Sequence, residues 1–167
     1  MGHTSVAFLS APRRLMADPD RVRHFRRLCR ALGLRGSVLY SPLTITDVQR
    51  ASAVLLAAPD APTAVITNSD YTAHAVYKAA RELRLRVGPE VSVVGHDDLP
   101  TSELLDSPLA TIRLDRLEMG RALMRRLLGQ VPPDDYIAPV DLIDRASLHP
   151  PAGKPASSGS DSAMPLA

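Results

Sequence analysis

The feature that most constrains the fold of this chain is a regular alternation of short apolar runs with longer amphipathic segments. Because the runs are almost continuously apolar, they are typical of strands that are buried on both faces of a sheet. Strands that alternate with helices predict an α/β three-layer sandwich with a central, mostly parallel sheet. The predicted strands are Val6–Ser10, Ser37–Ser41, Thr63–Thr67, Val91–Gly95 and Ala110–Leu114.

The amphipathic segments between the runs carry signals for helix starts and helix ends. Asp18 followed by Pro19 predicts the start of the first helix, and Gly33 predicts its end. Asp70 is expected to cap a later helix. The apolar stripe of the first helix is predicted at Val22, Phe25, Leu28, Cys29 and Leu32. The other predicted helices are Thr44–Ala57, Tyr71–Leu85 and Leu117–Leu128, and a weaker extended stretch lies within Tyr136–Leu148.

The chain is expected to form one domain followed by a short tail. Its 167 residues, 45% of them hydrophobic, suit a single soluble domain. Residues 150–167 are mostly Pro, Ser, Gly and Ala, so a disordered tail is predicted there and a folded domain over residues 1–149. The single cysteine, Cys29, excludes an intramolecular disulfide and is expected to be buried. No apolar run approaches the ~18 residues of a membrane span and the N-terminus lacks a signal-peptide pattern, so we expect a cytoplasmic protein.

Polar side chains gather where the predicted strands end, which is the edge at which open α/β sheets bind ligands. Ser69 and Asp70 come shortly after the third strand, and His96 and Asp97 follow the fourth directly. A carboxylate accepts hydrogen bonds from two hydroxyl groups at once, which suits a polyol such as a sugar, or a purine-like ligand. The alternative is that Asp97 and Asp98 cap loop amides in a turn.

The sequence offers little support for catalysis or metal binding. The five histidines are scattered, and no two of them have the spacing of a metal site on one helix. The chain contains no phosphate-binding loop, no dinucleotide-binding glycine motif and no nucleophile elbow. Ser69, His96 and Asp97 have no arrangement that identifies a catalytic triad. We therefore expect neither an enzyme nor a bound cofactor or metal.

The segment from Arg21 to Arg30 contains five arginines and allows two interpretations. One is a patch that binds phosphate groups. The other is the solvated face of an amphipathic helix, because the arginines at positions 23, 26, 27 and 30 lie mostly off the apolar stripe and no aromatic residues for base stacking lie between them. Charge runs of this kind usually form a solvated face, which favours the second interpretation.

Two stretches of sequence carry a resemblance to a known family. GHTSVAFLS near the N-terminus, and the stretch from PTAVITNSDYTAHAV to VSVVGHDDLPTSELLDSPLATIRLD, are similar to the second half of the effector-binding region of LacI/GalR-family transcriptional regulators. The resemblance covers about residues 2–148 and implies a lobe like those of type I periplasmic binding proteins. It implies that Asp97 binds effector hydroxyls, that Arg21 contacts effector, and that Ser69 stands where the family often has asparagine. Asp70 and His96 are further candidates for effector binding, after these three.

The resemblance also implies partners. Family members are cytoplasmic homodimers whose N-terminal helix-turn-helix binds operator DNA and whose two-lobed domain binds a small effector, often a sugar. The helix-turn-helix and most of the first lobe do not precede the matching region here, and Leu117–Leu128 is expected to be a remnant of that lobe. The chain is therefore predicted to be the sensor part of such a regulator, with DNA contact only through a head outside it. It is expected to form a homodimer or to pair with full-length relatives, and not to bind a membrane.

Three other functions remain open from the sequence. A truncated paralogue would act only through protein association, using Tyr71–Leu85 and Leu99–Pro108, which lie near the subunit contact in the family. A solute-binding protein would share the fold. A phosphoacceptor signalling domain needs clustered acids after the first strand and a lysine after the fifth. This chain has Ser-Ala-Pro and Arg113-Leu114-Asp115 at those places, which makes the last alternative weak.

Overall fold

The computed structural model describes residues 1–12, 19–132 and 136–152, and in this part of the chain six strands form a single sheet. The strand order is β2-β1-β3-β4-β5-β6, with all pairings parallel except the one between β5 and β6. The strands are β1 (Ser5–Ser10), β2 (Arg35–Tyr40), β3 (Ala64–Thr67), β4 (Ser92–His96), β5 (Ala110–Leu114) and β6 (Val140–Ile143). The helices are α1 (Pro19–Ala31), α2 (Ile45–Leu56), α3 (Asp70–Glu82) and α4 (Arg116–Leu127), with a short 3-10 helix at Pro100–Glu103.

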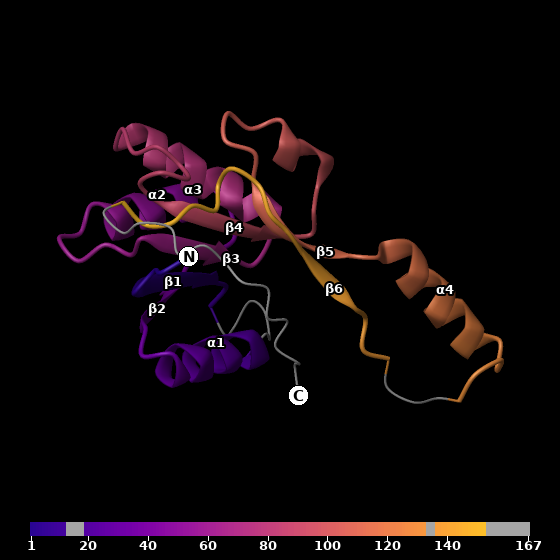
Figure 1. Cartoon of the computed structure of the whole chain (residues 1–167). Coiled ribbons are helices and arrows are strands. Elements are labelled where there is room, and N and C mark those ends of the chain that lie inside the picture. Colours follow the sequence, from indigo (N-terminus) through magenta and orange to yellow (C-terminus); the bar gives the residue numbers. More distant parts are fainter. Residues whose placement is uncertain (13–18, 133–135, 153–167) are drawn as a thin grey trace.

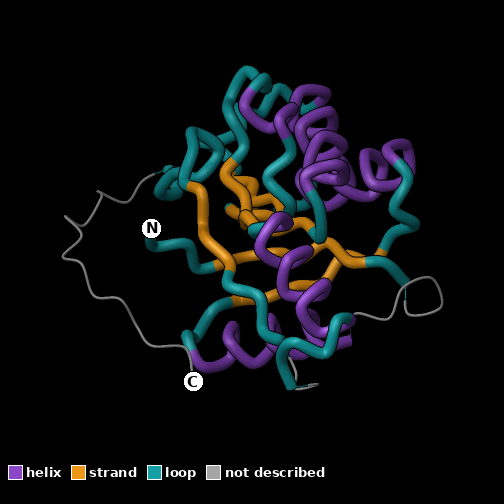
Figure 2. Tube along the Cα trace, turned by 90° about the vertical axis from the view of Figure 1, so that its right-hand side faces the viewer, coloured by secondary structure: helices purple, strands orange, loops and turns teal. Residues whose placement is uncertain are grey.

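The sheet lies between two layers of helix, as the sequence predicted. Helix α1 covers one face, and α2 and α3 lie side by side on the other (Figures 1 and 2). Side chains of a strand alternate between the two faces, so Leu9 and Val65 pack toward α2 and α3 while Val6 packs on α1. The three-layer α/β sandwich is therefore confirmed, and each of the five predicted strands lies within two residues of its predicted bounds.

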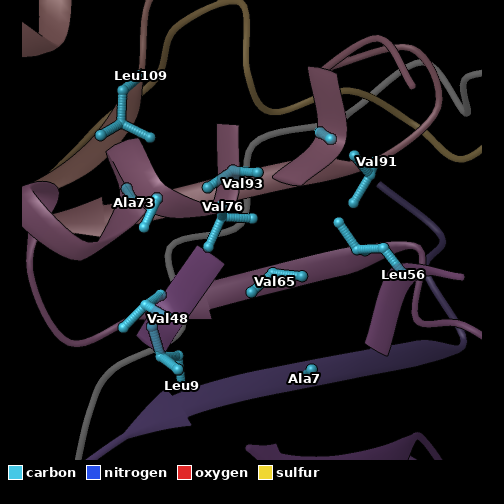
Figure 3. Packing of buried hydrophobic residues seen from close by; sticks show 12 residues of the cluster. Ala7, Leu9, Val48, Leu56, Val65, Ala73, Val76, Val91, Val93 and Leu109 are labelled. Carbon is cyan, nitrogen blue, oxygen red and sulfur yellow. The ribbon is translucent and has the colours of Figure 1, made fainter. Parts of the chain in front are cut away.

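The main hydrophobic core fills the space between the sheet and the pair α2 and α3 (Figure 3). Val48 of α2 and Val76 of α3 are fully buried there against Leu9, Val65 and Val93 of the central strands. Burial of an aliphatic side chain of this size contributes roughly 1.5–3 kcal/mol. This aliphatic packing holds α2 and α3 against the sheet.

Helix α1 has a narrower buried face than the sequence predicted. Val22 and Cys29 are buried, and Phe25 stacks on Phe8 of β1 with ring centroids 5.6 Å apart. However, Leu28 is 54% exposed and Leu32 67% exposed, so the prediction that they belong to the buried stripe is wrong. Only one flank of α1 rests on the sheet, and the two leucines lie beyond that contact. The arginines at positions 23, 26, 27 and 30 are exposed, as expected of a solvated face.

Helix α3 is capped by Ser69, and the prediction that Asp70 caps it is wrong. Ser69 has an extended backbone, and its hydroxyl accepts a hydrogen bond from the amide of Thr72, 3.2 Å away. This geometry is that of an N-cap residue. Asp70 is the first helical residue, and its side chain is fully buried. The helix ends at Glu82, three residues before the predicted end. Two residues after Glu82, Arg84 has a left-handed backbone with φ of 58°.

Helix α4 stands away from the layers at the end of the ribbon formed by β5 and β6 (Figure 1). The ribbon continues the sheet, with Thr111 paired to Ile143. On α4, Ala122 is buried, whereas Leu117 is 64% exposed and Leu127 80% exposed. The apolar face of this helix is therefore not covered by any other element among the described residues.

Two predictions fall outside the described residues: Asp18 as a helix cap, and the tail beyond residue 152. Both stay predictions. In the part of the chain that the structure describes, no helix is long and apolar enough to cross a membrane.

Candidate functional site

A cavity of about 380 Å³ opens at the carboxyl ends of β1, β3 and β4, between the first turns of α1 and α3. Four of the five site residues that the sequence predicted line it, namely Arg21, Ser69, His96 and Asp97. The strands are parallel, so residues far apart in the sequence reach the same edge of the sheet. The complete lining consists of Phe8, Ser10, Ala11, Arg21, Leu43, Asn68, Ser69, Tyr71, Thr72, His96 and Asp97.

Asp97 places a partly exposed carboxylate at this cavity. Its side chain is 39% exposed, and the Nδ1 atom of His96 lies 3.0 Å from its Oδ1 atom, within hydrogen-bond distance. Its backbone has φ of 113°, a conformation that L-residues rarely adopt. The amide of Asp97 donates to the carbonyl of Ile112 at 2.9 Å, and Arg116 donates to the carbonyl of Asp97. These contacts hold the strained turn and leave carboxylate oxygen available to accept from a ligand hydroxyl.

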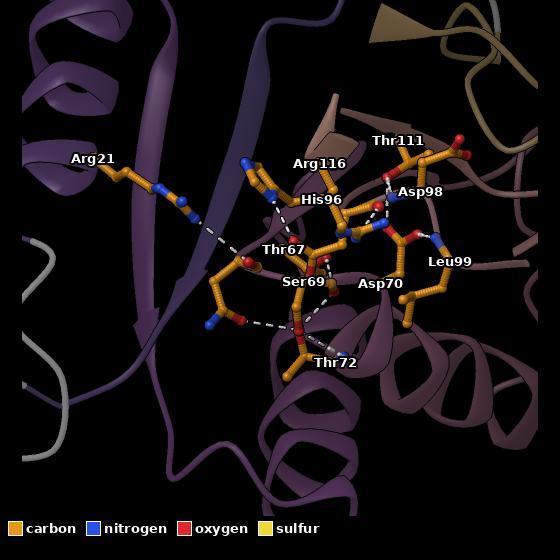
Figure 4. Close-up of polar contacts among 12 residues, drawn as sticks. Arg21, Thr67, Ser69, Asp70, Thr72, His96, Asp98, Leu99, Thr111 and Arg116 are labelled. Atoms are coloured by element: carbon orange, nitrogen blue, oxygen red, sulfur yellow. Dashed lines mark hydrogen bonds and ion pairs between the residues drawn. The ribbon is translucent and has the colours of Figure 1, made fainter. Parts of the chain in front are cut away.

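The opposite wall is built from the end of β3 and the start of α3. The hydroxyl of Thr72 donates either to Oδ1 of Asn68 or to the carbonyl of Ser69, both 2.9 Å away. A guanidinium nitrogen of Arg21 donates to the carbonyl of Asn68 at 3.4 Å, which ties α1 to the end of β3 (Figure 4). Amide, hydroxyl and guanidinium groups thus face the same cavity as the carboxylate. Such a set both donates to and accepts from a ligand that carries several hydroxyl groups.

Sequence reasoning missed the apolar part of the cavity. Phe8, Leu43 and Tyr71 line it, and Tyr71 is 53% exposed. Tyr71 lies in the first turn of α3, two residues after Ser69. The rule about strand ends could have found it, had aromatic residues been considered beside polar ones. An apolar ring face next to polar groups is suited to the alternating C–H and O–H surface of a sugar ring.

Asp70 does not line the cavity. Its carboxylate has no exposed surface and accepts hydrogen bonds from the amide of Leu99 at 2.8 Å and the hydroxyl of Thr111 at 2.5 Å (Figure 4). It also accepts from the hydroxyl of Ser102 at 2.6 Å. The expectation that it lies with the effector-binding side chains is therefore corrected. Three donors satisfy the charge in the interior, which makes Asp70 part of the framework beneath the cavity.

Asp98 also turns away from the cavity, into ion pairs. Its side chain is 12% exposed, and its two oxygens lie 2.5 Å from Arg113 and 2.8 Å from Arg145. Burial opposes ionisation of this carboxyl, but the hydrogen bonds and charges of the two arginines outweigh it and lower its pKa. Glu103 contacts Arg145 as well, at 2.8 Å. Asp98 thus ties the turn to Arg113 of β5 and to Arg145.

Among the described residues, no group of three or more His, Cys, Asp or Glu side chains is placed to hold a metal ion. Cys29 is buried, and burial raises the pKa of its thiol, as in a structural cysteine.

Comparison with known families places this architecture among regulators. The sequence model of one protein family, the periplasmic binding protein-like domain, matches residues 1–148 of this chain. The HTH-type transcriptional regulator MalR of Streptomyces coelicolor is 32% identical over 159 residues, which are 88% of this chain and 46% of that protein. The chain thus spans about half the length of this relative. The relative is named as a transcriptional regulator and not as an enzyme.

Solved structures agree with this comparison. A LacI family transcriptional regulator from Bifidobacterium animalis subsp. lactis superposes with a TM-score of 0.83 at 28% identity, covering 90% of this chain and 57% of that one. A LacI family regulator from Arthrobacter, in complex with lactose, has a TM-score of 0.74 at 26% identity, covering 87% and 58%. The lac repressor dimer bound to operator and an anti-inducer has a TM-score of 0.79 at 26% identity, covering 89% and 54%.

Proposed function

Because the chain belongs to the periplasmic binding protein-like family and corresponds to effector-binding sequence of LacI-family regulators, we propose that it binds a small sugar-like polyol at the cavity around Asp97. The observation that carries the proposal is the convergence of Arg21, Ser69, His96 and Asp97 on one cavity, from the first turn of α1 and from the ends of β3 and β4. Asp97 accepts from ligand hydroxyls, and Arg21 and Ser69 offer donors across from it. The structure of a related regulator with lactose supports the class of ligand.

The cavity is open on one side, which sets the expected affinity. Ligand sites usually enclose most of the ligand surface, whereas this chain spans about half the length of its relatives. The described residues therefore supply one wall of a cleft. We expect dissociation constants of the order of millimolar for this chain alone, since a ligand held on one face gains little of the energy that must offset its lost freedom.

The first experiment is a titration of the chain with lactose and with maltose, followed by NMR of the backbone amides. We expect the amides of Asp97 and Ser69 to shift on titration, and Asp97→Ala to abolish the shifts while the protein stays folded. Asp106→Ala is the matched control, because this exposed aspartate does not line the cavity. If Asp97→Ala responds to both sugars as the unaltered chain does, Asp97 is not in the site.

In the regulator, the chain would serve as the sensor part. An effector that binds the closed and open arrangements of the domain unequally shifts their populations. By linkage, that shift changes the affinity of a helix-turn-helix elsewhere in the protein for DNA. We propose that this happens in the cytoplasm. Fusing the chain to the remaining half of MalR should restore effector-dependent operator binding, measured by a gel-shift assay. A fusion that binds operator without any response to effector would contradict the sensor role.

We further propose that the partner is a second copy of the regulator. Helix α3 and the loop Leu99–Pro108 form the proposed contact surface, where Leu104 is 82% exposed. An apolar side chain so exposed gains stabilisation when a partner covers it. The mass in solution, measured by light scattering, should fall from dimer to monomer on Leu104→Asp, whereas Val54→Asp on the exposed face of α2 serves as the control. A chain that is monomeric without either change would contradict the proposal.

A further inference from the structure

Two consecutive residues of the cavity turn have a backbone conformation that favours glycine. Asp97 has φ of 113° and Asp98 has φ of 50°. Each such residue costs free energy and persists only where the surroundings hold it in place. The carboxylate that faces the cavity belongs to this turn, so whatever holds the turn also sets the direction of the ligand-binding oxygen atoms.

A hydrogen-bond relay runs from this turn to the buried carboxylate of Asp70. The amide of Asp98 donates to the hydroxyl of Thr111 at 3.3 Å, and the same hydroxyl donates to Oδ1 of Asp70 at 2.5 Å. A hydroxyl has one proton to donate and can accept at the same time, so both bonds form together. Thr111 is fully buried on β5 and does not line the cavity.

The second carboxylate oxygen of Asp70 holds the continuation of the same loop. Oδ2 accepts from the amide of Leu99 at 2.8 Å and from the hydroxyl of Ser102 at 2.6 Å. In Figure 4, Leu99 and Thr111 meet different oxygen atoms of the Asp70 carboxylate. Asp70 therefore holds Leu99 directly and Asp98 through Thr111, although it lies in α3, nearly 30 positions earlier in the sequence.

The strand that leads into the turn leaves room for this carboxylate. A Cβ atom at Gly95 would lie 2.1 Å from Oδ1 of Asp70, which no real structure allows. The glycine before the two acids is thus required by the position of Asp70, and not only by the bend of the chain.

From these contacts we propose that Asp70 is a positioning residue for effector binding. Its carboxylate acts through Thr111, Leu99 and Ser102 to fix the turn in which Asp97 faces the cavity. It does not touch the ligand. This inference rests on the proposed function, because a positioned carboxylate matters only if Asp97 binds effector.

The test compares Thr111→Val with Thr111→Ser. Valine has nearly the same shape as threonine but breaks the relay, whereas serine keeps the hydroxyl. Two quantities are measured: hydrogen exchange of the Asp98 and Leu99 amides without ligand, and the dissociation constant for lactose and maltose by NMR. We expect Thr111→Val to speed exchange of the Asp98 amide and to weaken sugar binding by about tenfold or more, the usual effect of losing a hydrogen bond to a charged group. Thr111→Ser should restore both to within about threefold.

Val48→Ala separates positioning from general loss of stability. Val48 is fully buried in α2, none of whose residues lines the cavity, and its truncation lowers the free energy of unfolding. We expect it to leave sugar binding unchanged. Unchanged exchange of the Asp98 and Leu99 amides in Thr111→Val, or equal weakening of binding in Val48→Ala, would overturn the positioning role. If the unaltered chain binds neither sugar, the proposed ligand class fails, while the exchange rates still decide whether Asp70 fixes the turn.

Discussion

Replacing Gly95 with alanine is expected to destabilise the protein severely, because the space beside Gly95 is occupied by Asp70. The new Cβ would lie 2.1 Å from Oδ1 and 3.1 Å from Cγ of that carboxylate, and 2.9 Å from a methyl group of Leu109. Gly95 lies within β4, so alanine suits its secondary structure and the effect is purely steric. Asp70 is fully buried, and three hydrogen bonds hold its carboxylate in place.

The magnitude follows from the hydrogen bonds of Asp70. A hydrogen bond to a charged group contributes about 1.5–3 kcal/mol. Displacing Oδ1 alone removes the bond to Thr111, and displacing the whole carboxylate weakens the bonds to Leu99 and Ser102 as well. We therefore expect a loss of about 3–5 kcal/mol, which is large for one substitution. In a chain of this size such a loss lowers Tm by roughly 10 °C.

The assay is urea unfolding followed by far-UV circular dichroism, because the chain has no tryptophan for fluorescence. A double-mutant cycle with Asp70→Ala isolates the contact. Once the carboxylate is gone, we expect Gly95→Ala to cost less than about 1 kcal/mol more. Gly120→Ala on α4 is the control, since a Cβ there meets nothing within 4 Å and alanine favours a helix. An equal cost of Gly95→Ala with and without Asp70 would refute the steric argument.

Three further predictions concern the turn and two titrating groups. Asp97→Gly should raise the free energy of unfolding by about 1 kcal/mol, because glycine adopts positive φ without strain, and should abolish sugar binding; lower stability in urea would contradict this. The pKa of Asp98 is lowered, so its ion pairs stabilise the fold above the carboxyl's ordinary value of 3.8 and this stabilisation is lost as the pH falls below it; Asp98→Asn should therefore destabilise at pH 7 and have little effect at pH 2, measured by urea unfolding. Burial raises the pKa of Tyr77 to about 12, so stability should fall as the pH rises above 10, where the unfolded chain loses that proton, and Tyr77→Phe should remove this dependence.

The sequence predicted the layers of the fold and the edge of the sheet that holds the cavity. It did not predict which of the acidic residues at that edge face the cavity and which are buried. Apolar runs and the rule about strand ends depend on local pattern, and both led to Asp97 and Ser69. Nothing local distinguishes Asp70, which is buried, from Asp97, which is not. That difference arises because Thr111 and Ser102, far along the chain, fold over α3 and supply donors. The prediction that Leu28 and Leu32 are buried was wrong for a similar reason, because helical spacing does not tell how wide the contact between the helix and the sheet is.

Of the two adjacent acids after β4, Asp97 faces the cavity and Asp98 forms ion pairs away from it. This difference affects which charge a ligand can carry. Asp98 pairs with two arginines and Glu103 pairs with one of them, so these four charges balance and add no net charge at the cavity. Among the described lining residues, Asp97 is the only acid and Arg21 the only arginine. The charges of these two residues cancel. A ligand with a phosphate group brings one to two further negative charges, and the carboxylate of Asp97 already balances the single arginine of the described lining. This charge balance favours an uncharged polyol over a sugar phosphate.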